Sequence, residues 1–257
     1  MEKRHIAVVM GGYSSEFEIS LQSGKVVCDS LDQHKYHIYP IHILKEEWYF
    51  LTQEGIKHPI NKADFSFSNG NETIIPDTIF NTIHGTPGED GYLQAYLNLI
   101  GIPQTSCDYY PAALSFNKRD CLSVLKGFGI KCAKSFYINK GIPFSEVEIV
   151  KKVGLPCFVK PNRAGSSFGI SKVHTISELL PAIEKAFEED LEIIIETAIQ
   201  GIEVSVGVFN NKKDIIVLPT TEIVSENDYF DYEAKYLGKS EEITPARISE
   251  KETEDVK

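Results

Sequence analysis

The chain has 257 residues, of which 42% are hydrophobic and 25% charged, and its formal net charge at pH 7 is −11. The length suggests two or three domains, and the composition is that of an ordinary soluble globular protein. The acidic excess disfavours nucleic acid as a partner, because nucleic-acid binding depends on Lys and Arg neutralising phosphates. No apolar run approaches the roughly 20 residues that cross a bilayer, so no membrane association is expected. The five cysteines lack a C-x-x-C pair, which favours reduced thiols in the cytoplasm.

The first third of the chain alternates strand-like and helix-like segments. HIAVVM at 5–10 is a continuous apolar run, as in a strand covered on both faces, and a helical pattern follows over 17–31. YHIYPIHIL and TIFNTIH predict further strands. This rhythm predicts an open, largely parallel, Rossmann-like sheet in an N-terminal α/β domain over 1–104.

The remainder begins with helical segments and continues with several strands. One helix is predicted over 108–129, another around SEVEIVKKVG and a third over SELLPAIEKAFEED. The predicted strands are KSFYIN, PCFVK, LEIIIE, EVSVGVF and DIIVLPTTEI, and the tail from Ser225 is predicted to be loop. Helices followed by runs of strands predict an α+β organisation. We divide this part of the chain into two lobes, 105–196 and 197–257.

The stretch KPNRAGSSFGISKV at 160–173 combines cations, glycines and hydroxyls after a predicted buried strand. Its glycines allow close backbone approach to a ligand, Ser166 and Ser167 can donate to anionic oxygens, and Lys160 adds positive charge. We therefore predict a loop that closes over phosphate. A plain turn with Lys160 in solvent is the alternative. The spacing is not that of a Walker motif, and the chain lacks G-x-G-x-x-G, which disfavours a nicotinamide dinucleotide.

Polar side chains follow two of the predicted parallel strands. Ser15 and Glu18 fit a capping box, which predicts Ser15 as the N-cap of the first helix. Glu16 is not needed for that cap, and a carboxylate at the carboxyl end of a parallel strand could hold an ammonium group. A first-turn acid favoured by the helix dipole is the alternative for Glu16.

The stretch NTIHGTPGEDGYLQ at 81–94 places His84 at the end of another predicted strand. Glu89 and Asp90 are predicted to open the next helix, where its dipole favours acids. Because His84 and Glu16 both fall at strand ends of one sheet, we expect them to share a site, although a purely structural histidine explains the pattern as well.

Two further stretches are candidates for ligand contact. Glu196 and Glu203 flank the short connection TAIQG, where backbone groups and a carboxylate could hold adenine and ribose, or where a solvated turn could simply lie. The segment 227–246 is too long and polar for a tight hairpin, so it is predicted to be a lid or a disordered loop. Its aromatic residues argue against disorder.

In this order the stretches resemble those of D-alanine–D-alanine ligases, members of the ATP-grasp superfamily. The resemblance rests on GGYSSEFEISLQSG, HGTPGEDGYLQ, GIPQTS, NKRDC, VKPNRAGSSFGISKV, IIIETAIQGIEVSV and FDYEAKY, and it extends over 7–246. It implies a substrate-binding N-terminal α/β domain with a Rossmann-like sheet, a central ATP-grasp lobe over 105–196, and the start of a C-terminal ATP-grasp lobe over 197–257.

The resemblance also implies a role for each candidate residue. The loop at 160–173 corresponds to the glycine-rich flap over the ATP phosphates. The positions that match ATP contacts are Lys118, Lys160, Ser167, Glu196, Ala198, Ile199, Glu203 and Lys235, with Ala198 and Ile199 at the adenine and Glu203 toward the ribose. The positions that match the catalytic and first-substrate site are Glu16, Ser166 and Tyr236, a hydrogen-bonded set around the substrate ammonium, and His84, near the substrate carboxylate.

The implied reaction is the ATP-dependent joining of two D-alanines through an acyl phosphate, for peptidoglycan precursors, by a cytoplasmic homodimer that uses Mg²⁺. Phe17 and Phe230 depart from the family's usual arginine and tyrosine. The family's R-x-D and N-E-x-N motifs have no match before Lys257, so we expect the magnesium ligands beyond residue 257 and the isolated chain to be a truncated, poorly active form.

Three alternatives remain at this point. A ligase that forms the ester D-alanyl-D-lactate is disfavoured by Tyr236, since ester-forming relatives generally carry another residue there. A truncated fragment that binds nucleotide without catalysis is the second alternative. A nicotinamide enzyme is the third, and the absent glycine fingerprint disfavours it.

Overall fold

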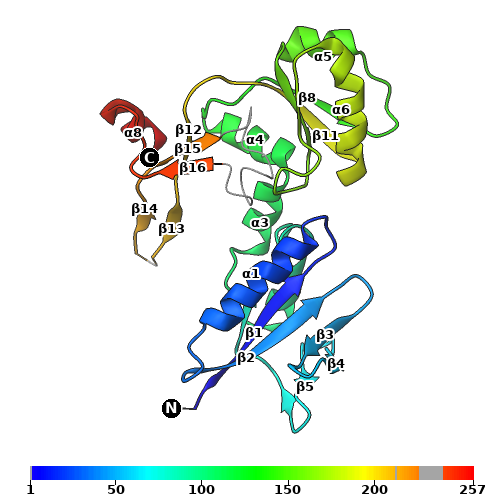
Figure 1. Ribbon diagram of the computed structural model, residues 1–257, viewed down its shortest axis with the longest axis vertical. Coiled ribbons are helices and arrows are strands. Elements are labelled where there is room, and N and C mark those ends of the chain that lie inside the picture. Colours follow the sequence, from blue (N-terminus) through cyan, green and yellow to red (C-terminus); the bar gives the residue numbers. More distant parts are fainter. Residues whose placement is uncertain (1, 212, 226–239) are drawn as a thin grey trace. The chain divides into compact units, whose positions relative to one another are not determined.

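The structure, a computed structural model, describes residues 2–211, 213–225 and 240–257 (Figure 1). The chain forms two compact units. The first contains the chain up to Cys132 together with Pro161–Gly165 and Glu189–Ile194, and the second contains Ala133–Lys160, Ser166–Glu188 and the described residues from Ile195 onward.

The first unit is built on a five-stranded sheet with the order β4-β3-β2-β1-β7. The strands are β1 (Arg4–Gly11), β2 (Tyr36–Ile43), β3 (Trp48–Leu51), β4 (Lys57–Pro59) and β7 (Thr78–Asn81). β1 pairs in parallel with both β2 and β7, whereas β3 and β4 add an antiparallel edge. The predicted parallel strands are therefore present, and the antiparallel strands β3 and β4 extend the sheet beyond β2.

Helices and a small hairpin complete the first unit. The helices are α1 (Phe17–Ser30), α2 (Tyr92–Ile100), α3 (Tyr109–Phe116) and α4 (Lys118–Gly127), and the hairpin pairs β5 (Phe67–Ser68) with β6 (Thr73–Ile74). α1 connects β1 to β2, and Figure 1 shows it running alongside β1.

Burial along β1 follows from its sequence. Ala7, Val8 and Val9 have no exposed surface. Ala7 and Val9 belong to the larger hydrophobic core, whereas Val8 packs in a cluster that includes Leu21 and Val27 of α1. Both faces of the strand are covered, as its unbroken apolar run predicts, and each buried valine contributes about 1.5–3 kcal/mol to folding.

The second part of the chain carries a four-stranded sheet with the order β10-β9-β11-β8. Its strands are β8 (Ser135–Asn139), β9 (Cys157–Pro161), β10 (Ser171–Val173) and β11 (Glu192–Thr197), and its helices are α5 (Glu146–Val153) and α6 (Ile176–Glu189). α6 buries Leu179, Ile183 and Ala186, which share one helical face. β9 and β10 are antiparallel, and the loop that joins them is the predicted flap.

The C-terminal part contains a three-stranded sheet and a separate hairpin. The sheet has the order β12-β15-β16, formed by β12 (Glu203–Ser205), β15 (Thr221–Ser225) and β16 (Ser240–Ile243), and the hairpin pairs β13 (Val208–Asn210) with β14 (Ile215–Val217). The last helix is α8 (Glu250–Val256). Ser249 is its N-cap and forms a capping box with Glu252. Among the described residues, no helix is long and apolar enough to cross a membrane.

Three local predictions about the first unit are wrong. α1 begins at Phe17 with no side-chain cap, because the Ser15 hydroxyl donates instead to Glu189 Oε2 at 2.7 Å. His84 lies in the loop beyond β7, which ends at Asn81. Glu89 precedes α2 rather than opening it, since Gly91, with φ 90°, precedes the first helical residue.

Two further predictions about secondary structure are wrong. The single helix expected over 108–129 is two helices, because Asn117 has extended backbone (φ −89°, ψ 100°) and its side chain caps α4 by accepting from Asp120 N. The tail from Ser225, expected to be loop, contains β16 and α8.

Close packing of α1 on β1 at Gly24 generates a first prediction. A Cβ at Gly24 would lie 2.7–2.8 Å from three side-chain atoms of Met10. Gly24→Val should therefore destabilise the protein by about 1–3 kcal/mol through overpacking, measured by urea unfolding. Gly127→Val is the control, because a Cβ there meets nothing within 4 Å. Equal stability of the two variants would contradict this packing.

An ion pair between the buried Glu222 of β15 and the exposed Arg247 generates a second prediction. Glu222, 6% exposed, accepts from Arg247 N, Nε and Nη2 at 2.8–3.0 Å, and these bonds lower the pKa of Glu222 to about 2. A lowered folded-state pKa stabilises the protein above the ordinary carboxyl pKa, and this contribution disappears as the pH falls toward 2.

Glu222→Gln should accordingly be less stable than the wild type at pH 7, and the difference should shrink as the pH falls from about 4.5 toward 2. Thermal unfolding followed across this range measures it, with the exposed Glu242→Gln as the control. A difference that does not change with pH would refute the assigned pKa.

Candidate functional site

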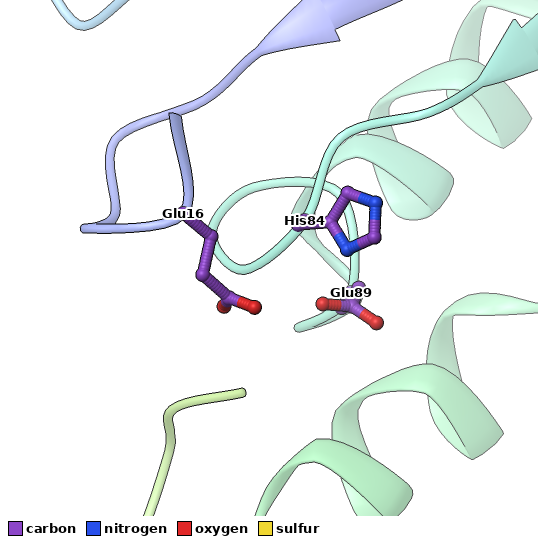
Figure 2. A group of neighbouring side chains, drawn as sticks. All are labelled: Glu16, His84 and Glu89. Carbon is purple, nitrogen blue, oxygen red and sulfur yellow. The ribbon is translucent and has the colours of Figure 1, made fainter. Parts of the chain in front are cut away.

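The first group of candidate residues lies where two parallel strands of the first unit end. Glu16 follows β1, and His84 and Glu89 follow β7. Figure 2 shows the three side chains turned toward one another, and their potential ligand atoms all lie within 4.8 Å of one another. Glu16 is 3% exposed. The structure thus brings Glu16 and His84 together and adds Glu89 to them.

Hydrogen bonds hold the two loops in this arrangement. The Ser14 hydroxyl donates to the His84 carbonyl at 3.0 Å and accepts from Glu16 N at 3.3 Å. Ser23 Oγ lies 3.1 Å from His84 Nε2. These contacts fix the backbone of both loops and the orientation of the imidazole ring.

Glu89 was predicted only as a helix-dipole acid, and its place beside Glu16 is new. Its Oε2 accepts from Gly85 N at 2.6 Å. Burial raises the pKa of Glu89 above its ordinary value, and the neighbouring charge of Glu16 adds to this rise. The signal that could have found Glu89 is its position five residues after His84 in the same loop.

Two glycines permit the close approach of these groups. At Gly165 a Cβ would lie 2.7 Å from Glu16 Oε1. At Gly85, with φ 72°, a Cβ would lie 2.3 Å from Ser14 Oγ. Glycine at position 165 therefore leaves room for the Glu16 carboxylate as it lies here, whereas the sequence suggested only an approach to phosphate.

A second cluster in the first unit surrounds Lys118, the first residue of α4. Lys118 Nζ donates to the carbonyl of Ala164 at 2.6 Å. Asn162, 1% exposed, accepts from Arg119 N and donates to Asn117 Oδ1. The start of α4 is thereby tied to the segment that leads into the flap.

Arg163 belongs to the same segment and was not predicted. Its Nε and Nη2 donate to the two carboxylate oxygens of Asp190 at 3.0 and 2.9 Å. This planar, two-point contact anchors the chain two residues before the flap glycine.

In the second unit, Lys160 and Glu196 form an ion pair. Lys160 Nζ donates to Glu196 Oε2 at 3.0 Å, between the neighbouring strands β9 and β11. Both side chains are largely covered, so Lys160 does not simply extend into solvent. The pair places a cation at the point where β9 gives way to the flap.

The flap itself has an unusual backbone. Ser166 and Ser167 have φ values of 48° and 62°, in the left-handed region that non-glycine residues seldom occupy. Successive backbone N–H groups in such conformations can form a concave anion-binding surface. This geometry suits the phosphate contact that the sequence predicts for Ser167.

A hollow of about 510 Å³ in the second unit brings together the residues predicted to contact adenine and ribose. Ala198, Ile199 and Glu203 line it. Phe158 and Lys172 also line it and were not predicted. Lys172 Nζ lies 5.9 Å from the centre of the Phe158 ring, so the hollow combines apolar, cationic and acidic groups.

Three residues singled out in the sequence, Lys235, Tyr236 and Phe230, lie outside the described residues. Their proposed places in the loop over the site stay predictions.

Comparisons with known proteins cover nearly the whole chain. Residues 5–107 match the family model described as D-ala D-ala ligase N-terminus, and residues 124–257 match D-ala D-ala ligase C-terminus. The D-alanine--D-alanine ligase of Flavobacterium johnsoniae is 62% identical over 253 residues, which are 98% of this chain and 78% of that protein. The protein of the same name from Christiangramia forsetii is 57% identical over 254 residues, 99% of this chain and 78% of that protein.

Solved structures are similar over the same extent. D-alanyl-alanine synthetase A from Vibrio cholerae has a TM-score of 0.84 at 28% identity and covers 100% of this chain and 78% of its own. The Bacillus anthracis D-alanine--D-alanine ligase complexed with ATP has a TM-score of 0.72 at 26% identity, over 98% of this chain and 74% of its own. These likenesses confirm the predicted fold class. The chain belongs to the D-alanine–D-alanine ligase family.

Proposed function

We propose that this chain serves the ATP-dependent joining of D-alanine to D-alanine through an acyl phosphate, for peptidoglycan precursors. The observation that carries the proposal is the 62% identity to a D-alanine--D-alanine ligase over 98% of the chain. The two groups of side chains described above supply what such a reaction needs, a site for an amino acid and a site for a nucleotide. From the family resemblance alone, we also propose a cytoplasmic homodimer.

The nucleotide site proposed here lies in the second unit. Its hollow is of the size that suits a nucleoside. The Phe158 ring offers an apolar face to adenine, backbone at Ala198 and Ile199 can meet the base edge, and Glu203 can accept from ribose hydroxyls. Lys160 and the flap hydroxyls would then contact phosphate oxygens. The similar structure from Bacillus anthracis that contains ATP supports this assignment.

The amino-acid site proposed here lies at Glu16 and His84. The Glu16 carboxylate would hold the ammonium of the first D-alanine, and His84 would lie near that substrate's carboxylate. An amine kept protonated by Glu16 cannot act as a nucleophile, so this substrate would react through its carboxylate. The carboxylate would attack the terminal phosphorus of ATP, the bond from that phosphorus to the bridging oxygen would break, and ADP would leave as the acyl phosphate forms. The amine of a second D-alanine would then displace phosphate from the acyl phosphate. A closed flap would keep water from this intermediate.

The Mg²⁺ that the family implies would neutralise charge on the transferring phosphoryl group when bound. Among the described residues, the one cluster of three candidate ligands is Glu16, His84 and Glu89, which includes an imidazole and belongs to the first unit. Mg²⁺ bound with phosphates prefers carboxylate and water oxygens. This cluster, with its imidazole, therefore does not fit that ion, and no step is derived through it.

The second substrate separates this proposal from related reactions. A ligase that joins D-alanine to D-lactate is one alternative, and a similar structure, 34% identical, is a D-Ala:D-Ser ligase from Enterococcus faecalis. Competition of D-lactate and D-serine with D-alanine for the second position, at neutral pH, distinguishes the three reactions by their products.

ATP binding tests the nucleotide site. Lys160→Met should raise the Kd for ATP about 10- to 100-fold, because a charge-assisted contact contributes roughly 1.5–3 kcal/mol. Isothermal titration calorimetry measures it, and Lys151→Met, on the exposed face of α5, is the control. Equal affinity of the Lys160 variant and the wild type would place the phosphates elsewhere.

D-alanine binding tests the amino-acid site. Glu16→Gln removes the charge that would pair with the ammonium, so D-alanine affinity should fall at least tenfold while ATP affinity changes little. Glu18→Gln, an exposed acid in the first turn of α1, should bind as the wild type does. If both variants bind D-alanine equally, Glu16 does not hold its amine.

A further inference from the structure

The convergence of Glu16, His84 and Glu89 suits a second kind of ligand besides an amino acid. Figure 2 shows two carboxylates and one imidazole facing a common space between the loops after β1 and β7. We infer that these three side chains form a binding site for one divalent transition-metal ion of the Zn²⁺ class.

The kind of donor selects this class of ion. Imidazole nitrogen and carboxylate oxygen bind Zn²⁺ at about 2.0–2.2 Å, whereas Mg²⁺ and Ca²⁺ favour sites made of oxygen alone. Ligand atoms around a tetrahedral ion lie about 3.4 Å apart at these bond lengths. The three donors here lie within 4.8 Å of one another, a separation that modest rotation of the side chains would shorten to the spacing around one ion.

The surrounding contacts orient two of the three donors. Ser23 Oγ lies 3.1 Å from His84 Nε2, which leaves Nδ1 for the ion. Glu89 Oε2 accepts from Gly85 N at 2.6 Å, which holds the carboxylate in place. Partners of this kind commonly fix the ring and raise the basicity of a metal-bound histidine. The bond from Ser14 to the His84 carbonyl keeps the two loops together.

The charges favour a dication in particular. Glu16 is buried whereas Glu89 is exposed, and two carboxylates a few ångströms apart repel each other. A divalent ion offsets two negative charges, whereas an ammonium offsets one. Three protein ligands leave one tetrahedral position for water or a small molecule, as in zinc sites that remain open.

An ion in this place would share Glu16 with the amine of D-alanine. The ion and the first substrate should therefore exclude each other, and the metal would act as a competitive inhibitor. This consequence rests on the proposed function, whereas the site itself rests only on the geometry of the three side chains.

The affinity of the 257-residue chain for Zn²⁺, measured by competition with a chromogenic chelator, tests the site. The expected result is one bound ion, with affinity at least tenfold weaker in both His84→Asn and Glu89→Gln, and about tenfold weaker in Ser23→Ala. His34→Asn and Glu54→Gln are matched controls on exposed loops and should bind as the wild type does. Unchanged affinity in folded His84→Asn would overturn the inference. Circular dichroism checks folding, and Glu89→Gln decides if His84→Asn does not fold.

The absorption spectrum of bound Co²⁺ separates this site from the five free cysteines. Nitrogen and oxygen ligands give no sulfur-to-cobalt charge-transfer band, so its absence from a bound Co²⁺ spectrum supports the site, and a spectrum dominated by that band overturns it. D-alanine should weaken Zn²⁺ binding, and failure to do so while D-alanine is bound overturns the exclusion. If D-alanine does not bind at all while Zn²⁺ binding still depends on His84, the metal site stands and the proposed substrate fails.

Discussion

Parallel pairing of β1 with β7 is the constraint on which the site of the first unit depends. Val9 of β1 lies opposite Asn81 of β7, so the two strands end at the same edge of the sheet. The pairing continues beyond the strand itself, because Thr82 donates from both its backbone N and its hydroxyl to the Val9 carbonyl. The chain leaving each strand then has only a few residues in which to diverge, which places Glu16 beside His84 and Glu89.

Adjacent strands also bring distant side chains together in the second part of the chain, where the residues are a lysine and a glutamate. β9 and β11 are neighbours, and this adjacency brings Lys160 to Glu196 although they are 36 residues apart. The carboxylate of Glu196 thus fixes the position of the Lys160 ammonium at the end of β9. The left-handed Ser166 and Ser167 lie shortly beyond it, so the charge of Lys160 and this unusual backbone come from a single short stretch.

Close packing around the functional groups explains several residue choices that charge does not. The Glu16 carboxylate fills the space where a Cβ of residue 165 would lie, and Ser14 fills the corresponding space at Gly85, whose φ of 72° also favours glycine. Met10 fills the corresponding space at Gly24, deep in the interface of α1 with β1. Tight contacts therefore link the sheet to the helix that covers it and the loop that carries Glu16 to its neighbours.

The sequence by itself determined the elements whose signals are local. The apolar run of β1, the position of Glu16 after that strand, and the cation at the end of β9 all follow from patterns a few residues long. The motifs in their order were also sufficient to indicate the ligase family. The domain boundaries placed at 104 and 196, and the roles of individual site residues, stay predictions.

Tertiary structure decided what depends on residues distant in the chain. Ser15 does not cap α1 because Glu189, 174 residues away, takes its hydroxyl, and no local pattern contains that partner. Glu89 lies beside Glu16 only because β1 and β7 are adjacent in the sheet. The sequence around Glu89 by itself predicts only the first turn of a helix. A local pattern reports which conformations a segment favours, but the partner that a side chain finally meets is chosen by strand order, and strand order is set by packing over the whole sheet.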